Sequence, residues 1–160
     1  MRTVTIAAGD TAPEFDLEET HDRRVRLSDF RGTTNVLLVF HPFAFTAVCE
    51  EEARDLQENL GSFRAANTEV VFVSCDTSAA RQAWRRQLGA DFVFASDFWD
   101  HGAAARSYGV FIEETGAPIR GTFLIDTEGT VIWSLVTDAG TRRQQLVSGP
   151  LSALPPSPGD

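Results

Sequence analysis

The sequence predicts an α/β sandwich with a mixed central sheet flanked by helices. Two continuous apolar runs, residues 35–40 and 70–75, are each followed by a segment with helical periodicity. This is the order expected of parallel strands joined by helical crossovers. Two later extended runs, residues 121–126 and 130–136, enclose a short turn that contains glycine, residues 127–129. Such a turn indicates a hairpin, so the last two strands are expected to be antiparallel.

The first third of the chain predicts an N-terminal β-hairpin extension and the longest helix. Extended runs at residues 14–18 and 24–27 are separated by the polar turn at residues 19–22, which favours a hairpin. From about residue 47 to residue 65, apolar side chains recur at spacings of four and three, the pattern of an amphipathic helix. These side chains are Cys49, Ala53, Leu56, Leu60 and Phe63.

Shorter helices are predicted in the second half of the chain. The segment at residues 78–88 is expected to be capped by Ser78 and ended by Gly89, because serine favours helix starts and glycine favours helix ends. A shorter helix is expected around residues 101–108. A last helix is expected to begin at residues 142–147 and to be interrupted by the Gly-Pro pair that follows, because proline disrupts helix interiors.

The chain is expected to form one domain over residues 1–154, with a disordered proline-rich tail at 155–160. The net charge of −9 disfavours binding to nucleic acid or to an anionic membrane. No stretch approaches the roughly 20 apolar residues of a membrane span. The N-terminal segment lacks the apolar region of a signal peptide, so the expected location is the cytoplasm. All 14 basic residues are arginine, which excludes a Schiff-base or P-loop lysine.

The chain has two cysteines, Cys49 and Cys75, too far apart in sequence for a Cys-x-x-Cys or zinc motif. Cys49 falls in the first turn of the long helix, directly after a buried strand. Unpaired backbone N–H groups and the helix dipole favour an anion there. A cysteine in such a position can have a pKa well below the free value of about 8.5 and act as a nucleophile. Thr46 can cap this helix and direct its hydroxyl at the sulfur.

The motif Pro42-x-x-x-Thr46-x-x-Cys49 resembles the active-site motif of the peroxiredoxins. The wider run, residues 40–49, resembles the alkyl hydroperoxide reductase E type, a subfamily that often lacks a resolving cysteine. The resemblance extends from about residue 8 to residue 140 and implies a thioredoxin-like fold and a thiol-dependent peroxidase. The other matching segments are Ala12-Pro13-x-Phe15, Val73-Ser74-x-Asp76, Ser96-Asp97-Phe98-Trp99, Tyr108-Gly109-Val110 and Arg120-Gly121-Thr122-Phe123.

The resemblance implies a role for each residue of the motif. Cys49, as thiolate, would attack a hydroperoxide and become a sulfenic acid. The Thr46 hydroxyl, the Cys49 backbone N–H and Arg120 would donate hydrogen bonds to the charge as it moves to the departing oxygen. Arg120 would also favour the thiolate, and Pro42 would close the loop above it. Glu52 lies three residues after Cys49 on nearly the same helix face, and in the family a glutamate at this offset holds the arginine.

No such role is expected for Glu50 and Glu51, the two acidic residues that precede Glu52. Acidic residues are favourable in the first turn of any helix, and this plain interpretation is preferred for both. Glu50 is expected to pair with Arg54 at i+4, whereas Glu51 is expected to be solvated. The same plain interpretation stays open for Glu52.

The second thiol, Cys75, ends a buried strand and is expected to be structural. Arg54 occupies the position five residues after Cys49 where a resolving thiol would be sought. The thiol that resolves Cys49 is therefore expected to come from elsewhere, through a mixed disulfide. Its source is a low-molecular-weight thiol, a thioredoxin-like or glutaredoxin-like protein, or a second subunit. No cofactor is expected, and the three scattered histidines argue against a metal site.

Four residues are candidates for a substrate pocket: His41, Phe43, Phe45 and Trp99. His41 stands where many relatives carry an aromatic side chain, and it can either fill space or tune a pKa near neutrality. The three aromatic residues can be plain core. The resemblance instead implies that they border both the pocket and a homodimer contact, where exposed aromatic rings are common.

Two other functions stay open. One is a thioredoxin-fold module that senses redox state or binds a partner without turnover. The other is a peroxiredoxin fold repurposed in biosynthesis. The intact set of Pro42, Thr46, Cys49 and Arg120 favours the peroxidase, because neither alternative needs all four.

Overall fold

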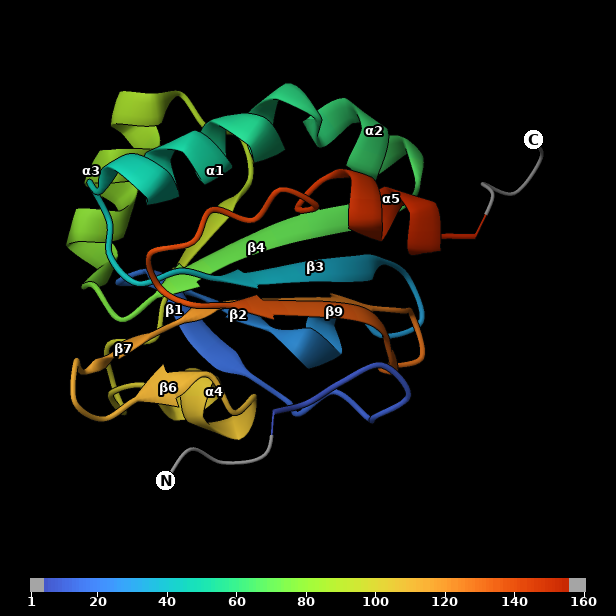
Figure 1. Cartoon of the computed structure of the whole chain (residues 1–160), viewed down its shortest axis with the longest axis horizontal. Helices are drawn as coiled ribbons and strands as arrows, with labels where there is room; N and C mark the ends of the chain where they lie inside the picture. Colours follow the sequence, from blue (N-terminus) through green and yellow to red (C-terminus); the bar gives the residue numbers. More distant parts are fainter. Residues whose placement is uncertain (1–4, 156–160) are drawn as a thin grey trace.

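The structure, a computed structural model, describes residues 5–155 and contains one large sheet with helices on both faces (Figure 1). The strands are β1 (Asp16–Thr20), β2 (Arg23–Arg26), β3 (Asn35–Phe40), β4 (Thr68–Ser74), β5 (Val93–Ser96), β6 (Phe111–Ile112), β7 (Ala117–Pro118), β8 (Arg120–Ile125) and β9 (Val131–Thr137). The helices are α1 (Ala47–Glu58), α2 (Leu60–Ala65), α3 (Ser78–Leu88), α4 (Ala103–Ser107) and α5 (Ser148–Ala153), with a 3-10 turn at Leu27–Asp29.

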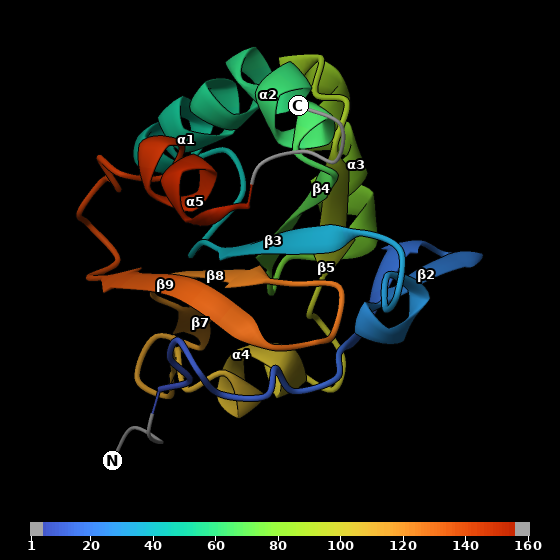
Figure 2. The ribbon, with the colours of Figure 1, turned by 90° about the vertical axis from the view of Figure 1, so that its right-hand side faces the viewer.

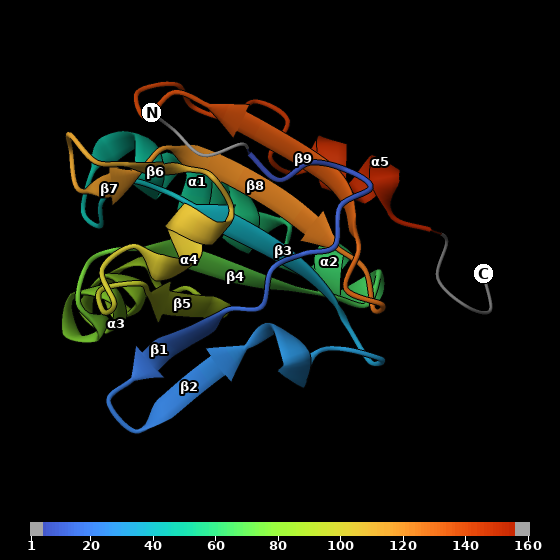
Figure 3. The same ribbon diagram turned by 90° about the horizontal axis from the view of Figure 1, so that it is seen from below.

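The central sheet has seven strands in the order β2-β1-β5-β4-β3-β8-β9, which can be followed across Figure 3. Strand β4 pairs in parallel with both β3 and β5. The N-terminal hairpin β1–β2 and the C-terminal hairpin β8–β9 add antiparallel pairs at the two edges. The predicted mixed sheet with an N-terminal hairpin is confirmed.

The layers on the two faces follow from the alternation of side chains along the strands. Helices α1, α2, α3 and α5 cover one face, and α4 with the small β6–β7 hairpin covers the other (Figure 2). In β3, Leu37 and Val39 pack toward the four helices, whereas Val36 and Leu38 pack toward α4. All six residues of β3 are buried, as its continuous apolar run predicted.

The long predicted helix is two helices, α1 and α2, because the chain leaves helical geometry at Asn59. Its backbone has φ −109° and ψ 10°, and its side-chain amide donates to the Asp55 carbonyl at 2.8 Å. The cap of α3 is also corrected. Thr77 accepts a hydrogen bond from the Ala80 N–H, and Ser78 is the first helical residue. Gly89 ends α3 at φ 66°, as predicted.

Other elements also differ from the sequence prediction. Strands β5, β6 and β7 were not predicted, because segments of two to four residues are too short to give a clear period. The last helix begins at Ser148, whereas residues 144–147 form a turn and residues 142–143 have no regular structure. The pair Gly149-Pro150 therefore starts this helix and does not interrupt it, because first-turn N–H groups have no helical partner and proline lacks only that group.

The predicted disordered tail, residues 155–160, lies outside the described residues except for Pro155. Within residues 5–155, no helix is both long and apolar enough to cross a membrane.

Candidate active site

The loop between β3 and α1 brings the predicted site together. The His41 N–H donates to the Val73 carbonyl at 2.9 Å and so extends the β3–β4 ladder by one residue. The chain then turns away, and the Ala44 N–H donates to the Asp76 carboxylate at 2.7 Å. Phe45 has φ 65°, a left-handed conformation that costs a non-glycine residue on the order of 1 kcal/mol or more. The contacts of this loop hold it in a shape the chain would not adopt alone.

Cys49 is the third residue of α1, and Thr46 occupies the N-cap position. The first helical hydrogen bond runs from the Glu50 N–H to the Thr46 carbonyl, so the Cys49 N–H is one of the first-turn donors without a helical acceptor. The Thr46 hydroxyl makes no cap. It donates instead to the Phe43 carbonyl at 2.8 Å. The predicted donation from Thr46 to the sulfur is therefore replaced by a contact within the loop.

Arg120 reaches the sulfur from the adjacent strand. Strand β8 is antiparallel to β3, and the pairing of Thr122 with Val39 leaves Arg120 beside the loop that follows β3. Its Nη1 lies 3.3 Å from the Cys49 Sγ, and its Nε donates to the Ala139 carbonyl at 2.7 Å. Both side chains are almost completely buried. The residues predicted to meet, 71 positions apart in the chain, are in contact.

Glu52 holds Arg120, as predicted, and also holds a second arginine that the sequence analysis missed. Arg120 Nη1 donates to Glu52 Oε1 at 2.6 Å. Arg143 donates to the same carboxylate through Nε, Nη2 and its own backbone N–H, at 2.8–2.9 Å. Arg143 comes from the segment between β9 and α5, which runs back toward α1 in Figure 1. A helix was predicted there, so no residue of it was sought as a site residue.

Glu52, Arg120 and Arg143 form a buried charge cluster, and the charges of its three members do not cancel. Burial alone would raise the pKa of Glu52, but the hydrogen bonds and charge of Arg143, followed by the charge of Arg120, lower it below its ordinary value. Glu52 is therefore ionised. One carboxylate then faces two buried guanidinium groups, which leaves one positive charge beside the Cys49 sulfur.

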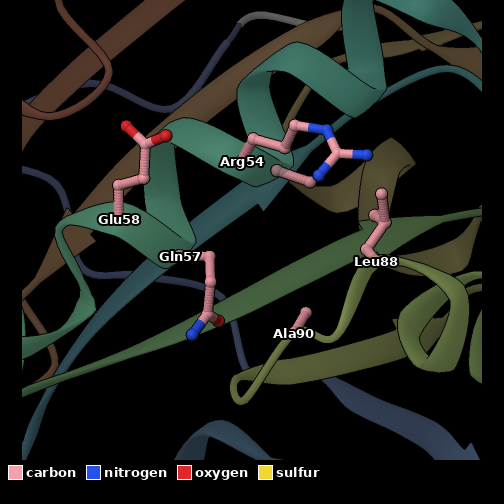
Figure 4. A pocket seen from close by; sticks show the side chains of 6 residues that line it. Arg54, Gln57, Glu58, Leu88 and Ala90 are labelled. Atoms are coloured by element: carbon pink, nitrogen blue, oxygen red, sulfur yellow. The ribbon is translucent and has the colours of Figure 1, made fainter.

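The other first-turn acids lie outside this cluster. Glu50 pairs with Arg54 at 3.8 Å, as predicted, and Glu51 pairs with Arg142 at 3.3 Å instead of being only solvated. Arg54 borders a surface pocket between α1 and the end of α3 (Figure 4). The pocket contains no predicted site residue; its lining is Ala53, Arg54, Gln57, Glu58, Leu88 and Ala90.

Cys75 has the surroundings of an unreactive thiol. It is buried, and burial, followed by the charges of Asp97 and Asp76, raises its pKa to about 12. A thiol with such a pKa contributes almost no thiolate at neutral pH. The prediction that Cys75 is structural agrees with this environment.

The four predicted pocket residues separate into two groups. Phe43, Phe45 and Trp99 are exposed, with Trp99 reaching 78%. His41 is completely buried instead, with its ring stacked on Phe72 at 4.0 Å. His41 is enclosed behind the loop between β3 and α1, so it does not face an open pocket.

Asp97 is a buried carboxylate at the N-terminal end of α4, and it gives a pH-dependent prediction. It accepts hydrogen bonds from the Ala104 and Ala105 N–H groups, yet burial raises its pKa to about 6. An unfolded Asp has a pKa of about 3.9. The folded state therefore binds more protons between these two values, and Asp97 makes the protein more stable as the pH falls through about 6.

We expect this effect to appear when urea unfolding of the wild type is compared with that of Asp97→Asn. Between pH 7 and pH 5, the wild type should gain roughly 1 kcal/mol relative to the variant. Asp100→Asn, at an exposed neighbouring position, is the control and should follow the wild type. Identical pH slopes for the wild type and Asp97→Asn would contradict the assignment.

The fold and the site together define a class. A thioredoxin-like α/β sandwich presents a cysteine at the start of a helix, and a buried arginine contacts its sulfur. This is the arrangement of a protein that performs thiol redox chemistry.

Comparison with known proteins agrees with this class. The AhpC/TSA family profile matches residues 8–134. Alkyl hydroperoxide reductase E of Mycobacterium tuberculosis is 38% identical over 150 residues, which are 93% of this chain and 98% of the relative. The chain belongs to the AhpC/TSA family, the peroxiredoxins, and is a thiol-dependent peroxidase.

Solved structures give the same result. The crystal structure of Enterococcus faecalis AhpC superposes with a TM-score of 0.81 at 26% identity, covering 93% of this chain and 92% of that one. Peroxidoxin BcpB of Mycobacterium tuberculosis superposes with a TM-score of 0.83 at 25% identity, covering 92% of this chain and 96% of that one.

Proposed function

We propose that Cys49 is the catalytic thiol of this peroxidase and that it reduces hydrogen peroxide and organic hydroperoxides. The observation that carries the proposal is the 3.3 Å contact between Arg120 Nη1 and the Cys49 sulfur at the start of α1. Within residues 5–155 no arginine donates a hydrogen bond to Cys75, and burial raises its pKa to about 12, so it is not proposed to react.

The charge of the buried cluster supports an anionic sulfur. Arg120, Arg143 and Glu52 together carry one net positive charge inside the protein. An isolated buried charge is costly. Ionised Cys49 would balance it, with two positive and two negative groups in contact. The Cys49 backbone N–H and the helix dipole add to the same effect.

The proposed reaction is one two-electron transfer. The Cys49 thiolate attacks the nearer oxygen of the hydroperoxide, an S–O bond forms and the O–O bond breaks. Sulfur is oxidised to the sulfenic acid, and the second oxygen leaves as hydroxide or alkoxide, which then takes up a proton. Negative charge moves from sulfur to that oxygen, so donors already in place along the path lower the barrier. Arg120 and the Cys49 N–H are these donors.

Thr46 has a different role from the one first expected. Its hydroxyl proton is directed at the Phe43 carbonyl, so its oxygen is left free to accept a hydrogen bond. We propose that it accepts a hydrogen bond from the O–H of the incoming hydroperoxide and so orients the peroxide.

Pro42 is buried and closes the loop without an N–H to satisfy. Because the sulfur is fully buried, substrate entry requires a small movement of neighbouring side chains.

An external thiol would regenerate the enzyme in two steps. The first thiol condenses with the sulfenic acid, which releases water and leaves a mixed disulfide on Cys49. A second thiol then attacks the external sulfur of this disulfide, so that the two external thiols leave joined by a disulfide and the free Cys49 thiol is restored. A low-molecular-weight thiol, or a thioredoxin-like or glutaredoxin-like protein, can supply both. Cys75, which is buried and directly follows β4, is not proposed to take part.

We propose that the protein is located in the cytoplasm and that it assembles as a homodimer. Phe43, Phe45, Phe98 and Trp99 are the large apolar side chains that are exposed in residues 5–155. Rings of this kind are enriched in protein interfaces, and they would also receive the apolar part of an organic hydroperoxide. Sedimentation of the full chain at the mass of one protomer would exclude the dimer.

Turnover with a matched pair of cysteine variants tests the proposed function. Peroxide consumption is measured in the presence of excess dithiothreitol as the thiol. We expect Cys75→Ser to retain the activity of the wild type and Cys49→Ser to fall to the rate of dithiothreitol alone. Loss of activity in Cys75→Ser with the fold intact, or its retention in Cys49→Ser, would overturn the proposal.

A further inference from the structure

A third buried arginine, Arg81, lies behind the active-site loop, and within residues 5–155 it forms no hydrogen bond or ion pair with a carboxylate. Its side chain is fully buried. Nε donates to the Ala95 carbonyl at 3.0 Å and Nη2 to the Phe72 carbonyl at 2.7 Å. Its guanidinium also lies 5.0 Å from the centre of the Phe94 ring. The third hydrogen bond is with His41, whose Nε2 is 2.6 Å from Nη1.

The contact with Arg81 determines how His41 carries its proton. An arginine only donates hydrogen bonds, so His41 Nε2 must accept and the proton must be on Nδ1. Burial, followed by the charges of Arg81, Arg143 and Arg120, lowers the pKa of His41 well below its ordinary value. The ring is therefore neutral, and it presents a fixed N–H donor on its other side.

That donor is buried and has no hydrogen-bond partner within residues 5–155. The ring nevertheless interacts with the backbone of Phe43, which lies in the active-site loop. The same Phe43 carbonyl accepts the Thr46 hydroxyl at 2.8 Å. A chain of contacts thus runs from Arg81 through His41 and Phe43 to Thr46.

We propose that His41 is a positioning residue for peroxide reduction: held by Arg81, its Nδ1–H orients the Phe43 carbonyl and, through it, the Thr46 hydroxyl. This rests on the proposed function of Cys49. The two edges of the ring then have separate tasks. The Nε2 edge satisfies the buried Arg81 and stabilises the fold, whereas the Nδ1 edge sets the loop geometry and affects the rate.

Two amide variants separate these tasks, because the asparagine amide matches the Nδ1 position and the glutamine amide matches the Nε2 position. His41→Gln keeps an acceptor for Arg81 but loses the donor toward Phe43. His41→Asn keeps the donor but loses the acceptor. We measure the rate of Cys49 oxidation by hydrogen peroxide in single turnover, together with the midpoint of urea unfolding.

We expect His41→Gln to oxidise about tenfold more slowly, the size of effect given by a small misplacement of a site group, and to be the more stable of the two variants. His41→Asn should react faster than His41→Gln although it unfolds at lower urea. A purely structural role would make the rates follow the stabilities, and that result would overturn the proposal. So would a wild-type rate in His41→Gln.

Nitrogen NMR of the imidazole in the wild type provides a measurement that needs no variant to fold. The proposal requires the neutral tautomer with the proton on Nδ1. An Nε2–H tautomer or an imidazolium at pH 7 would overturn it. Failure of the proposed function has a different signature, because the wild-type Cys49 would then not be oxidised at all.

Discussion

Replacing Arg120 with methionine is expected to slow the oxidation of Cys49 by peroxide about 100- to 1,000-fold. Removal of one preorganised donor from the path of a developing charge typically has this effect, and Arg120 is the side chain in contact with the sulfur. The fold should persist, because Glu52 then faces only Arg143 and the buried charges cancel. Stopped-flow fluorescence can follow the reaction through Trp84, whose ring lies 6.0 Å from that of Phe45 in the loop.

Two further variants make the Arg120 experiment specific. Arg120→Lys keeps the charge but loses the planar fork that bridges sulfur, Glu52 and the Ala139 carbonyl, so its rate should fall between those of the wild type and Arg120→Met. Arg54→Met removes an exposed arginine from α1 and should leave the rate unchanged. If the folded Arg120→Met protein reacted at the wild-type rate, Arg120 would not contribute to peroxide reduction.

Glu52→Gln is expected to produce the largest loss of stability, about 3–5 kcal/mol, because loss of one partner from a buried ion pair leaves its counter-charge unpaired. Here two guanidinium groups, Arg120 and Arg143, would lose their common carboxylate. The stability is measured by urea unfolding at pH 7, where the lowered pKa of Glu52 keeps the wild-type carboxylate ionised.

Glu50→Gln is the matched control for this measurement. It makes the same chemical change two residues earlier in α1, at a partly exposed ion pair with a distance of 3.8 Å. Exposed pairs of this kind contribute roughly 0–1 kcal/mol, so the variant should unfold close to the wild type. Equal losses in the two variants would mean that the buried cluster does not stabilise the fold.

Much of the fold could be predicted because its signals are local. The apolar run of β3, the helical spacing after it and the glycine turn between β8 and β9 each specify one element within a few residues. Strand β5 was not predicted, because its four residues carry little periodicity. The start of α5 was misplaced because a Gly-Pro pair can either end a helix or begin one, and only packing decides between them.

The candidate site could be predicted only in part, for a similar reason. The contact between Cys49 and Arg120 was expected from the resemblance of two motifs, one in each half of the chain. Arg143 and Arg81 belong to no such motif, and one arginine among 14 basic residues gives no signal by itself. Asp76 had a signal that was not used: an acid two residues after β4 lies at the edge of the sheet where the active-site loop also begins.

The most direct test of the account is the mass of the protein after reaction with one equivalent of hydrogen peroxide, followed by peptide mapping. The structure predicts that the mass rises by one oxygen atom and that this oxygen is on Cys49, where an arginine contacts the sulfur. It predicts no oxygen on Cys75, whose thiol is buried with a pKa of about 12. An unchanged mass, or an oxygen found on Cys75 with Cys49 still reduced, would contradict the account.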